Sequence, residues 1–340
     1  MGRERIARLL RGEEVDRPAV AAWRHFPQDD QDAAELAEST VRFQREYDWD
    51  LVKVTPAQSY LAELWGAQAV YSGDAMGVRE FTRRPVGSFG DWRSLAEPDQ
   101  RKWTEVLGRY VEAVGRVKEA VGADGVVLAT IFTPLSIARY LAGEELFLAS
   151  VRMVPEDVQR FLGFAAEVVE ALIGRVVGAG ADGCFVSLFS AGSGTFGEAE
   201  YRSVAGETDR RVFTAAQGGW FNIAHFHSPY PLLRLAGEYG VEAVSWDCHA
   251  GGPSLREVSR LCPDQVLVGG VDQRGWLVTA QAAEVRERAR SLFGASGTGA
   301  GSSVRLVVAP GCTVSQATPF GNLRALRHSV DVEPASGEAR

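Results

Sequence analysis

Short runs of apolar residues alternate with segments of helical periodicity along most of the chain. Between the runs, apolar positions recur every three to four residues, which is the spacing of one helix face. The runs themselves lack strict polar alternation, as is typical of strands buried on both faces of a parallel sheet. The eight runs lie at residues 19–23, 51–55, 126–131, 183–188, 221–227, 242–246, 265–271 and 304–309.

Eight such strands separated by helices predict an α/β fold of the (β/α)8 TIM-barrel type. After the second strand, residues 71–94 break into short pieces with turn residues, which predicts a hairpin-like insertion. We expect residues 1–330 to form a single domain and residues 331–340 to form a polar tail. The main helical segments are expected at 2–11, 32–47, 100–121, 155–179, 231–239, 280–293 and 320–330.

An open doubly wound sheet is the alternative arrangement of these elements. Such a sheet carries a G-x-G-x-x-G turn after its first strand. No such motif follows residues 19–23, and Gly192-Ser193-Gly194 lies too far along the chain to serve as one. The barrel is therefore favoured.

Composition narrows the classes of function. With 46% hydrophobic and 24% charged residues, the chain resembles a soluble globular protein. The net charge of −8 and the lack of a basic run exclude electrostatic support for a nucleic-acid or membrane partner. The charged N-terminus lacks the apolar core of a secretion signal, and no apolar run is long enough to span a bilayer. We expect a cytoplasmic protein with reduced thiols, because its four cysteines, Cys184, Cys248, Cys262 and Cys312, are scattered.

The most distinctive chemistry lies at the end of the run at 221–227. His225 and His227 are two residues apart, so on a strand their imidazoles point the same way. In a barrel the carboxyl ends of the strands face the mouth where chemistry takes place. We expect Cys312, in the turn after the eighth run, to reach over the same mouth.

Two neutral imidazoles and one thiolate suit Zn²⁺, which takes three protein ligands in a catalytic site and leaves one position open. A metal site at His225, His227 and Cys312 is therefore one interpretation. In the other, the histidines hydrogen-bond an organic substrate and Cys312 fills space. The residues alone leave both open.

Further polar residues follow the ends of other runs. Asp247 and His249 are candidates for acid and base catalysis, although Asp247 also suits the cap of the next helix. Tyr140 is a third catalytic candidate, with a buried tyrosine bonded to backbone as the alternative. Arg24 can anchor a carboxylate or phosphate, or pair with an acidic residue across the mouth. The candidate substrate-binding residues are Arg24, His25, Gln58, Tyr60 and Asp272.

A set of short segments lies in a fixed order over the whole chain, at 3–5, 10–13, 15–20, 47–56, 132–134 with Tyr140, 269–272, and 309–312 followed by 318–319 and 322–323. These segments resemble the uroporphyrinogen decarboxylase superfamily, which includes zinc-dependent methyltransferases that move methyl groups between corrinoid proteins and thiols. The resemblance implies a (β/α)8 barrel with its pocket at the carboxyl ends of the strands, and a homodimer.

The decarboxylases of this superfamily use paired arginines near the first strand, an aspartate after the second, a tyrosine and a late histidine, without a cofactor. Here Arg24 has no second arginine in the expected place, and Thr55-Pro56-Ala57 stands where the aspartate would lie. Cys312 occupies the region of the late histidine, so only Tyr140 matches. Without the aspartate, no carboxylate holds the pyrrole N–H donors or stabilises charge on the ring, which argues against porphyrinogen decarboxylation.

The methyltransferase branch is more similar. It binds zinc through a His-x-Cys on the fifth strand and a later cysteine, which His225 and Cys312 match. His227 stands where the first cysteine would be. An imidazole in place of a thiolate raises the net charge and the Lewis acidity of the site, so the substrate activated there is not restricted to a thiol.

Three hypotheses follow. The leading one is a zinc-dependent methyltransferase-type enzyme that activates a small substrate at its His-x-His and Cys site, with a corrinoid as candidate methyl donor and a corrinoid protein as candidate partner. The second is a metal-free, uroporphyrinogen-decarboxylase-like lyase that acts on a carboxylated, tetrapyrrole-like substrate. The third is a non-catalytic binder of corrinoid or porphyrin.

Overall fold

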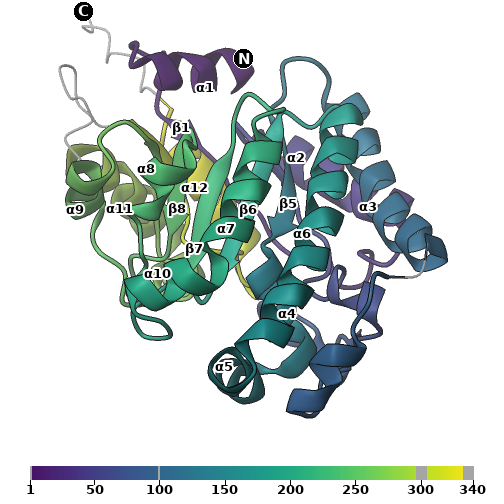
Figure 1. Ribbon diagram of the computed structural model, residues 1–340. Coiled ribbons are helices and arrows are strands. Elements are labelled where there is room, and N and C mark those ends of the chain that lie inside the picture. The colour runs from purple at the N-terminus through teal and green to yellow at the C-terminus, as the bar shows by residue number, and fades with distance from the viewer. Residues whose placement is uncertain (1, 99, 296–304, 332–340) are drawn as a thin grey trace, which may run out of the picture.

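The structure, a computed structural model, describes residues 2–98, 100–295 and 305–331 and contains a curled sheet of eight parallel strands (Figure 1). The predicted barrel-type α/β fold is confirmed. The strands run in the order β1-β10-β9-β8-β7-β6-β5-β2. They are β1 (Ala19–Val20), β2 (Val52–Val54), β5 (Val127–Phe132), β6 (Gly183–Phe189), β7 (Ile223–His227), β8 (Ala243–Trp246), β9 (Val266–Val271) and β10 (Leu306–Pro310).

The curled sheet closes where β1 meets β2. No ladder of hydrogen bonds joins these two strands within the described ranges. Instead, the Asp50 N–H donates to the Val20 carbonyl at 3.0 Å, and the Val20 N–H donates to the Asp50 carboxylate at 2.8 Å. A side chain thus replaces part of the missing ladder.

Helices surround the sheet, and several begin at side-chain caps. Asp32 accepts hydrogen bonds from two N–H groups at the start of α2, and Ser254 and Glu257 form a capping box at the start of α9. Thr133 caps α4, whose first residue is Pro134. The helices are α1 (Gly2–Arg11), α2 (Ala33–Tyr47), α3 (Gln100–Val121), α4 (Pro134–Ala142), α5 (Glu144–Met153), α6 (Pro155–Gly178), α7 (Glu198–Ala216), α8 (Leu235–Tyr239), α9 (Leu255–Leu261), α10 (Trp276–Thr279), α11 (Ala282–Ala295) and α12 (Phe320–His328), with 3-10 turns η1 (Ala62–Trp65) and η2 (Phe89–Ser94).

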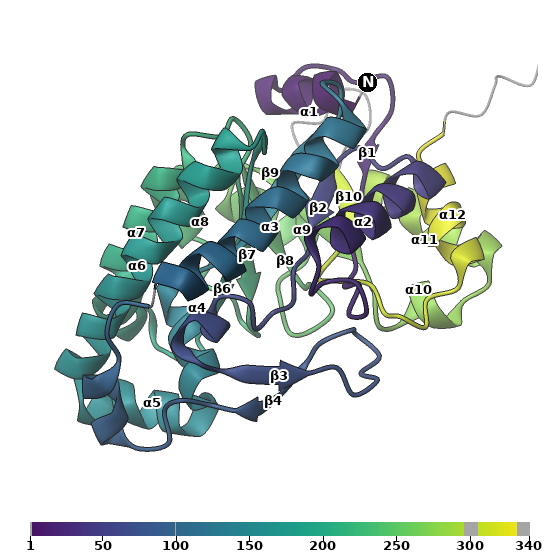
Figure 2. The same ribbon diagram turned by 90° about the vertical axis from the view of Figure 1, so that its right-hand side faces the viewer.

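The predicted hairpin is present as the antiparallel pair β3 (Gln68–Val70) and β4 (Glu80–Arg83), which begins slightly earlier than expected. Figure 2 shows this hairpin at one end of the barrel and α1 at the other. A helix, α1, therefore lies over the amino-terminal end of the barrel, and the hairpin lies at the carboxyl end.

One local prediction was wrong, and one helix was missed. The helix expected at 231–239 begins only at Leu235, because Pro231 bridges to Gly192 and the Leu232 N–H donates to the Ala191 carbonyl. Helix α10 was not predicted. Of the predicted tail at 331–340, all but Asp331 lies outside the described residues.

The barrel interior is apolar at the amino-terminal ends of the strands and polar at their carboxyl ends. Ile6 of α1 is fully buried in an interior cluster with side chains that include Leu51, Phe185 and Val307. Toward the carboxyl ends, the inward-facing positions become Lys53, His225 and similar residues. The apolar layer thus forms the floor on which a polar cavity rests.

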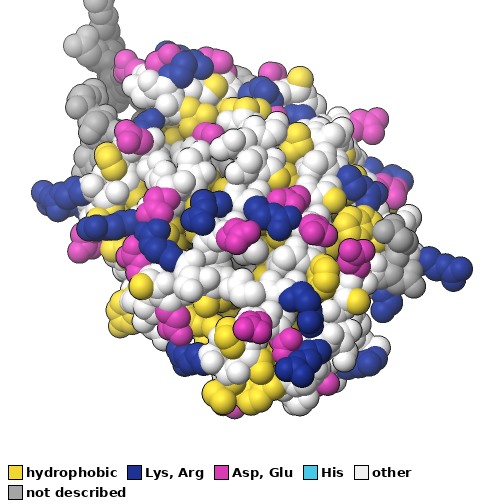
Figure 3. Space-filling view, viewed as in Figure 1, with side chains coloured by type: hydrophobic (Ala, Val, Ile, Leu, Met, Phe, Trp, Pro, Cys, Tyr) yellow, Lys and Arg dark blue, Asp and Glu magenta, His cyan; other side chains and the backbone are white. Residues whose placement is uncertain are grey.

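The outer surface shows no concentration of one charge on the face seen in Figure 3, where basic and acidic side chains of the described residues are interspersed. None of the helices in the described part of the chain is both long and apolar enough to cross a membrane.

Candidate functional site

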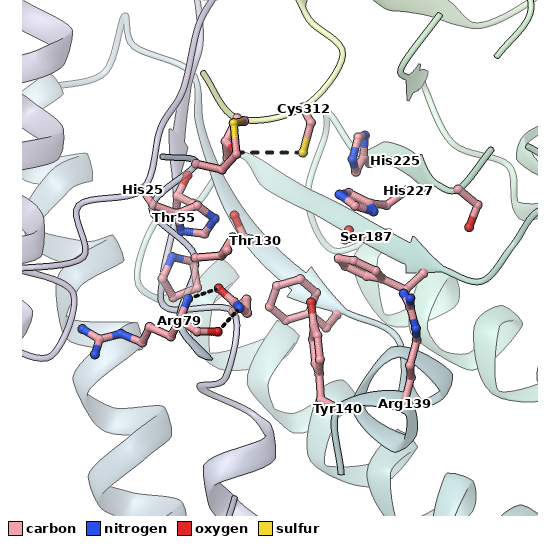
Figure 4. A pocket seen from close by; sticks show the side chains of 18 of the residues that line it. His25, Thr55, Arg79, Thr130, Arg139, Tyr140, Ser187, His225, His227 and Cys312 are labelled. Carbon is pink, nitrogen blue, oxygen red and sulfur yellow. Dashed lines mark hydrogen bonds between the residues drawn. The ribbon is translucent and has the colours of Figure 1, made fainter. Parts of the chain in front are cut away.

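A cavity of about 940 Å³ opens at the carboxyl ends of the strands. Its lining comes from the strand ends, the loops that follow them and the hairpin, and Figure 4 shows side chains from opposite walls pointing into it. This is the end of a barrel at which enzymes of this fold carry their active sites.

Three side chains that can ligate a metal converge on one wall of this cavity. His225 and His227 come from β7, and Cys312 comes from the turn after β10 (Figure 4). One ligand atom from each lies within 4.8 Å of the others. The alternation of side chains along β7 places both imidazoles on the same side. We call these three residues the His-His-Cys triad.

Neighbouring side chains orient the two imidazoles. The His225 Nδ1 lies 3.2 Å from the Ser245 hydroxyl, which leaves Nε2 as its free ligand atom. The His227 ring stacks on Phe189, with centroids 4.1 Å apart, and the His225 ring packs on Phe185 at 4.9 Å. A hydrogen bond to the second ring nitrogen is the usual way in which proteins fix a metal-ligating histidine.

The turn that carries Cys312 is also held in place. The Gln273 side chain donates to the Asp247 carboxylate at 2.6 Å and accepts the Gly311 N–H at 2.9 Å. A Cβ at Gly311 would lie 2.7 Å from the Asp247 Cα, so this close approach requires glycine. Asp247 thus acts on Cys312 through Gln273 and through packing against Gly311.

The triad favours a thiolate. Burial works to raise the pKa of the Cys312 thiol, but the charge of His227 and hydrogen bonding to both imidazoles hold this pKa well below its usual value. Burial lowers the pKa of His225. For His227 burial acts in the same direction, but the Cys312 thiolate outweighs it and raises the pKa. A thiolate beside two imidazoles is the donor set of a zinc site.

The family model described as uroporphyrinogen decarboxylase (URO-D) matches residues 1–332. The chain belongs to this family. The resemblance found in the sequence is thereby confirmed. Among curated protein sequences, none matches the chain.

Solved structures share the fold of this URO-D family protein. A methyltransferase from Methanosarcina mazei is 18% identical, with a TM-score of 0.80 over 96% of this chain and 97% of that one. A B12-independent methionine synthase from Shewanella sp. W3-18-1, in complex with selenomethionine, is 11% identical, with a TM-score of 0.55 over 87% and 86%. A putative vitamin-B12-independent methionine synthase from Listeria monocytogenes is 13% identical, with a TM-score of 0.51 over 92% and 94%. At these identities the likeness concerns the fold.

One functional candidate in the cavity of this URO-D protein, Lys53, was not predicted from the sequence. Lys53 of β2 lines the cavity, is 7% exposed, and donates to the Thr55 hydroxyl at 3.2 Å. Its amine lies 4.8 Å from the centroid of the Phe185 ring. Burial lowers the pKa of Lys53 to about 7, although the Cys312 thiolate acts to raise it. The available signal was its spacing, two residues before the strand-end residue Thr55.

Besides the His-His-Cys triad, three further predicted residues line the cavity. Burial, followed by the charge of Lys53, lowers the pKa of His25 to about 4. Gln58 ties its loop to the hairpin, since it donates to the Arg79 carbonyl at 2.8 Å and accepts the Arg79 N–H at 3.0 Å. Tyr140 of α4 stacks on Phe81 of β4, and burial raises the pKa of its hydroxyl.

The other predicted residues lie outside the lining of this cavity. Arg24 bonds to the Gln316 side chain, and the Tyr60 hydroxyl donates to the Thr130 carbonyl at 2.9 Å. The Asp272 carboxylate accepts the Gly275 N–H at 2.8 Å before α10. His249 Nε2 contacts the Gly270 carbonyl at 3.1 Å, and Asp247 makes the contacts described above. These five residues hold loops or neighbouring side chains in place.

Proposed function

We propose that this URO-D family protein is a zinc-dependent enzyme of methyltransferase type that activates a small substrate, with a thiol as the first class to test. The observation that carries the proposal is the convergence of the His-His-Cys triad within 4.8 Å on the wall of the cavity. Membership of the URO-D family supports an enzymatic role.

The residues present fit a zinc ion. Two imidazoles and one thiolate supply the three protein ligands of a catalytic site, and the cavity lies open beside them for a fourth. The Ser245 contact to His225 supplies an outer hydrogen bond that such a ligand normally has. A bound zinc ion would lower the pKa of a thiol substrate so that the thiolate is the form that accepts a methyl group.

The remaining side chains hold the substrate and exclude water. The raised pKa of Tyr140 keeps its hydroxyl protonated at neutral pH, so this group acts as a hydrogen-bond donor inside the cavity. His25 is neutral at this pH. The stacked rings of Phe189 and His227 form an apolar surface beside the reacting atoms. A corrinoid is the proposed methyl donor, presented by a partner protein at the mouth.

The proposal is tested with free methylcobalamin and a panel of small thiols. We expect zinc-loaded wild-type protein to consume methylcobalamin and form a methyl thioether, and the Cys312→Ala variant to lose this activity at least a hundredfold. No thioether with any thiol, under conditions in which the protein binds zinc, would count against methyl transfer to thiols.

A metal-free lyase acting on a carboxylated, tetrapyrrole-like substrate is the second candidate. The buried amine of Lys53 in the lining favours it, because an ammonium without a carboxylate partner among the described residues can bind a carboxylate of the substrate. The volume of the cavity, about 940 Å³, also suits a large ligand. Decarboxylation of a porphyrinogen that continues after zinc is removed by a chelator would favour this candidate over the first.

A further inference from the structure

Lys53 is a buried cation that faces the cavity without an acidic partner. It is 7% exposed, and among the residues that the structure describes no carboxylate pairs with it. Its hydrogen bond to Thr55 uses one of the three N–H donors of an ammonium group. Two donors therefore remain for a ligand. A buried charge of this kind is costly unless something pairs with it.

Three arginines of the same lining are engaged with protein groups, and a fourth, Arg274, is exposed. Arg79 pairs with Asp30 at 2.5 Å, and Arg139 pairs with Glu144 at 2.9 Å. The Arg84 guanidinium bonds to a backbone carbonyl and lies 4.2 Å from the centre of a phenylalanine ring. These pairings leave Lys53 as the buried cation available to a ligand.

Burial lowers the pKa of Lys53 to about 7, but one contact of its amine favours the charged form. The face of Phe185 lies 4.8 Å from the amine, a geometry that stabilises an ammonium. His25 is neutral near pH 7, so it adds little repulsion. The anionic group that acts on Lys53 among the described residues is the Cys312 thiolate, which a metal at the triad would engage. A ligand is then the remaining source of negative charge.

We infer that Lys53 anchors a carboxylate of the substrate, whose other end reaches the His-His-Cys triad across the same cavity. This inference deepens the proposed function and rests on it for the position of the reacting end. A single ammonium with a neighbouring hydroxyl suits a singly charged head group, whereas phosphate sites usually combine arginine forks with several N–H donors.

The presence of a lysine, and not an arginine, at position 53 agrees with a role in binding a carboxylate. Only three of the 36 basic residues in the chain are lysines, at positions 53, 102 and 118. An ammonium is a compact point charge, whereas a guanidinium is a larger planar fork. A lysine at position 53 thus occupies less of the cavity than an arginine would.

The test compares 3-mercaptopropionate with its neutral amide, 3-mercaptopropionamide, by calorimetric titration of the zinc-loaded full-length protein. We expect wild-type protein to bind the acid at least tenfold more tightly than the amide. Lys53→Met should weaken binding of the acid at least tenfold and change binding of the amide less than twofold. Lys102→Met, which removes an exposed lysine of α3, should retain the preference of the wild type.

Equal binding of acid and amide by wild-type protein overturns the inference, so the test does not depend on how the variants fold. A Lys53→Met protein that holds zinc and keeps the preference also overturns it. Cys312→Ala separates the two proposals. If this variant binds both thiols as tightly as wild type, while the acid remains preferred, the thiol does not use the triad and the proposed function fails, whereas the role of Lys53 stands.

Discussion

Two buried acidic residues at the amino-terminal end of the barrel and one buried lysine at the carboxyl end differ in how completely their charges are paired. At the amino-terminal end, Asp50 accepts hydrogen bonds from Arg5, Arg17 and the Val20 N–H. Asp182 likewise pairs with Arg3 and Lys118 and accepts from the Trp220 indole and the Val127 N–H. At the carboxyl end, Lys53 has a single hydroxyl partner.

This difference separates the charges that hold the fold from those that await a ligand. Completely paired buried charges lock the strands and α1 in register, and their removal damages stability. An incompletely paired charge in a cavity costs stability and therefore indicates a functional role. Three substitutions test the comparison, from the largest expected effect to the smallest.

Asp50→Asn should cause the largest effect. It leaves Arg5 and Arg17 near an uncharged amide, and breaking a buried pair in this way costs about 3–5 kcal/mol of unfolding free energy. Urea denaturation measures this loss. The matched control is Asp16→Asn, since Asp16 also pairs with Arg5 but is 64% exposed and should contribute about 0–1 kcal/mol. Equal losses in the two variants would show that pairing at this end does not hold the fold.

Ser245→Ala should weaken zinc binding about 10- to 100-fold, because it removes the outer hydrogen bond that orients His225. Competition with a chelator of known affinity measures the change. Ser259→Ala, at a partly buried position of α9 outside the cavity lining, serves as the control and should leave zinc affinity unchanged. Unchanged affinity in the Ser245 variant would mean that His225 is oriented by packing alone.

Asp209→Asn should have the smallest effect, and one that depends on pH. Asp209 is fully buried between α7 and α8, and burial raises its pKa to about 6, although Tyr201 and Tyr239 donate to it. Its second oxygen has no hydrogen-bond partner within the described residues. Asp209 is therefore a buried acidic residue that is incompletely hydrogen-bonded but lies between helices, outside the cavity lining, unlike Lys53.

The direction in which stability changes with pH follows from the protons that Asp209 binds in the folded and unfolded states. Between about pH 4 and pH 6 the folded state holds a proton on Asp209 that the unfolded state has lost, so this group's contribution to stability falls as the pH rises. Relative to Asp209→Asn, the wild type should lose about 1 kcal/mol between pH 5 and pH 7 in urea denaturation. Parallel pH profiles for the two proteins would contradict this expectation.

The fold could be predicted from the sequence because the eight buried runs carry a strong periodic signal. The His225 and His227 pair could be placed on one face from strand alternation alone. The alternation of side chains also explains why Arg24 does not line the cavity. Trp23, one residue earlier, packs inside the barrel 5.3 Å from Phe185, so Arg24 projects to the other side.

Lys53 was harder to identify. It lies inside an otherwise apolar run, where one polar side chain does not reveal whether it faces the cavity or the surrounding helices. The contacts of Asp247 with Gln273 and Gly311 join loops that lie far apart in the chain, and spacing carries no information on them. Contacts of this kind can be identified only once the three-dimensional structure is known.

The most direct measurement is the zinc content of the purified protein, determined by elemental analysis for the wild type and for Cys312→Ala. Binding at the His-His-Cys triad predicts about one zinc ion per wild-type chain after equilibration with zinc and removal of the excess, and a much smaller content in the variant. A wild-type protein that retains no zinc, or a variant that retains as much as the wild type, would contradict a metal site at these three residues.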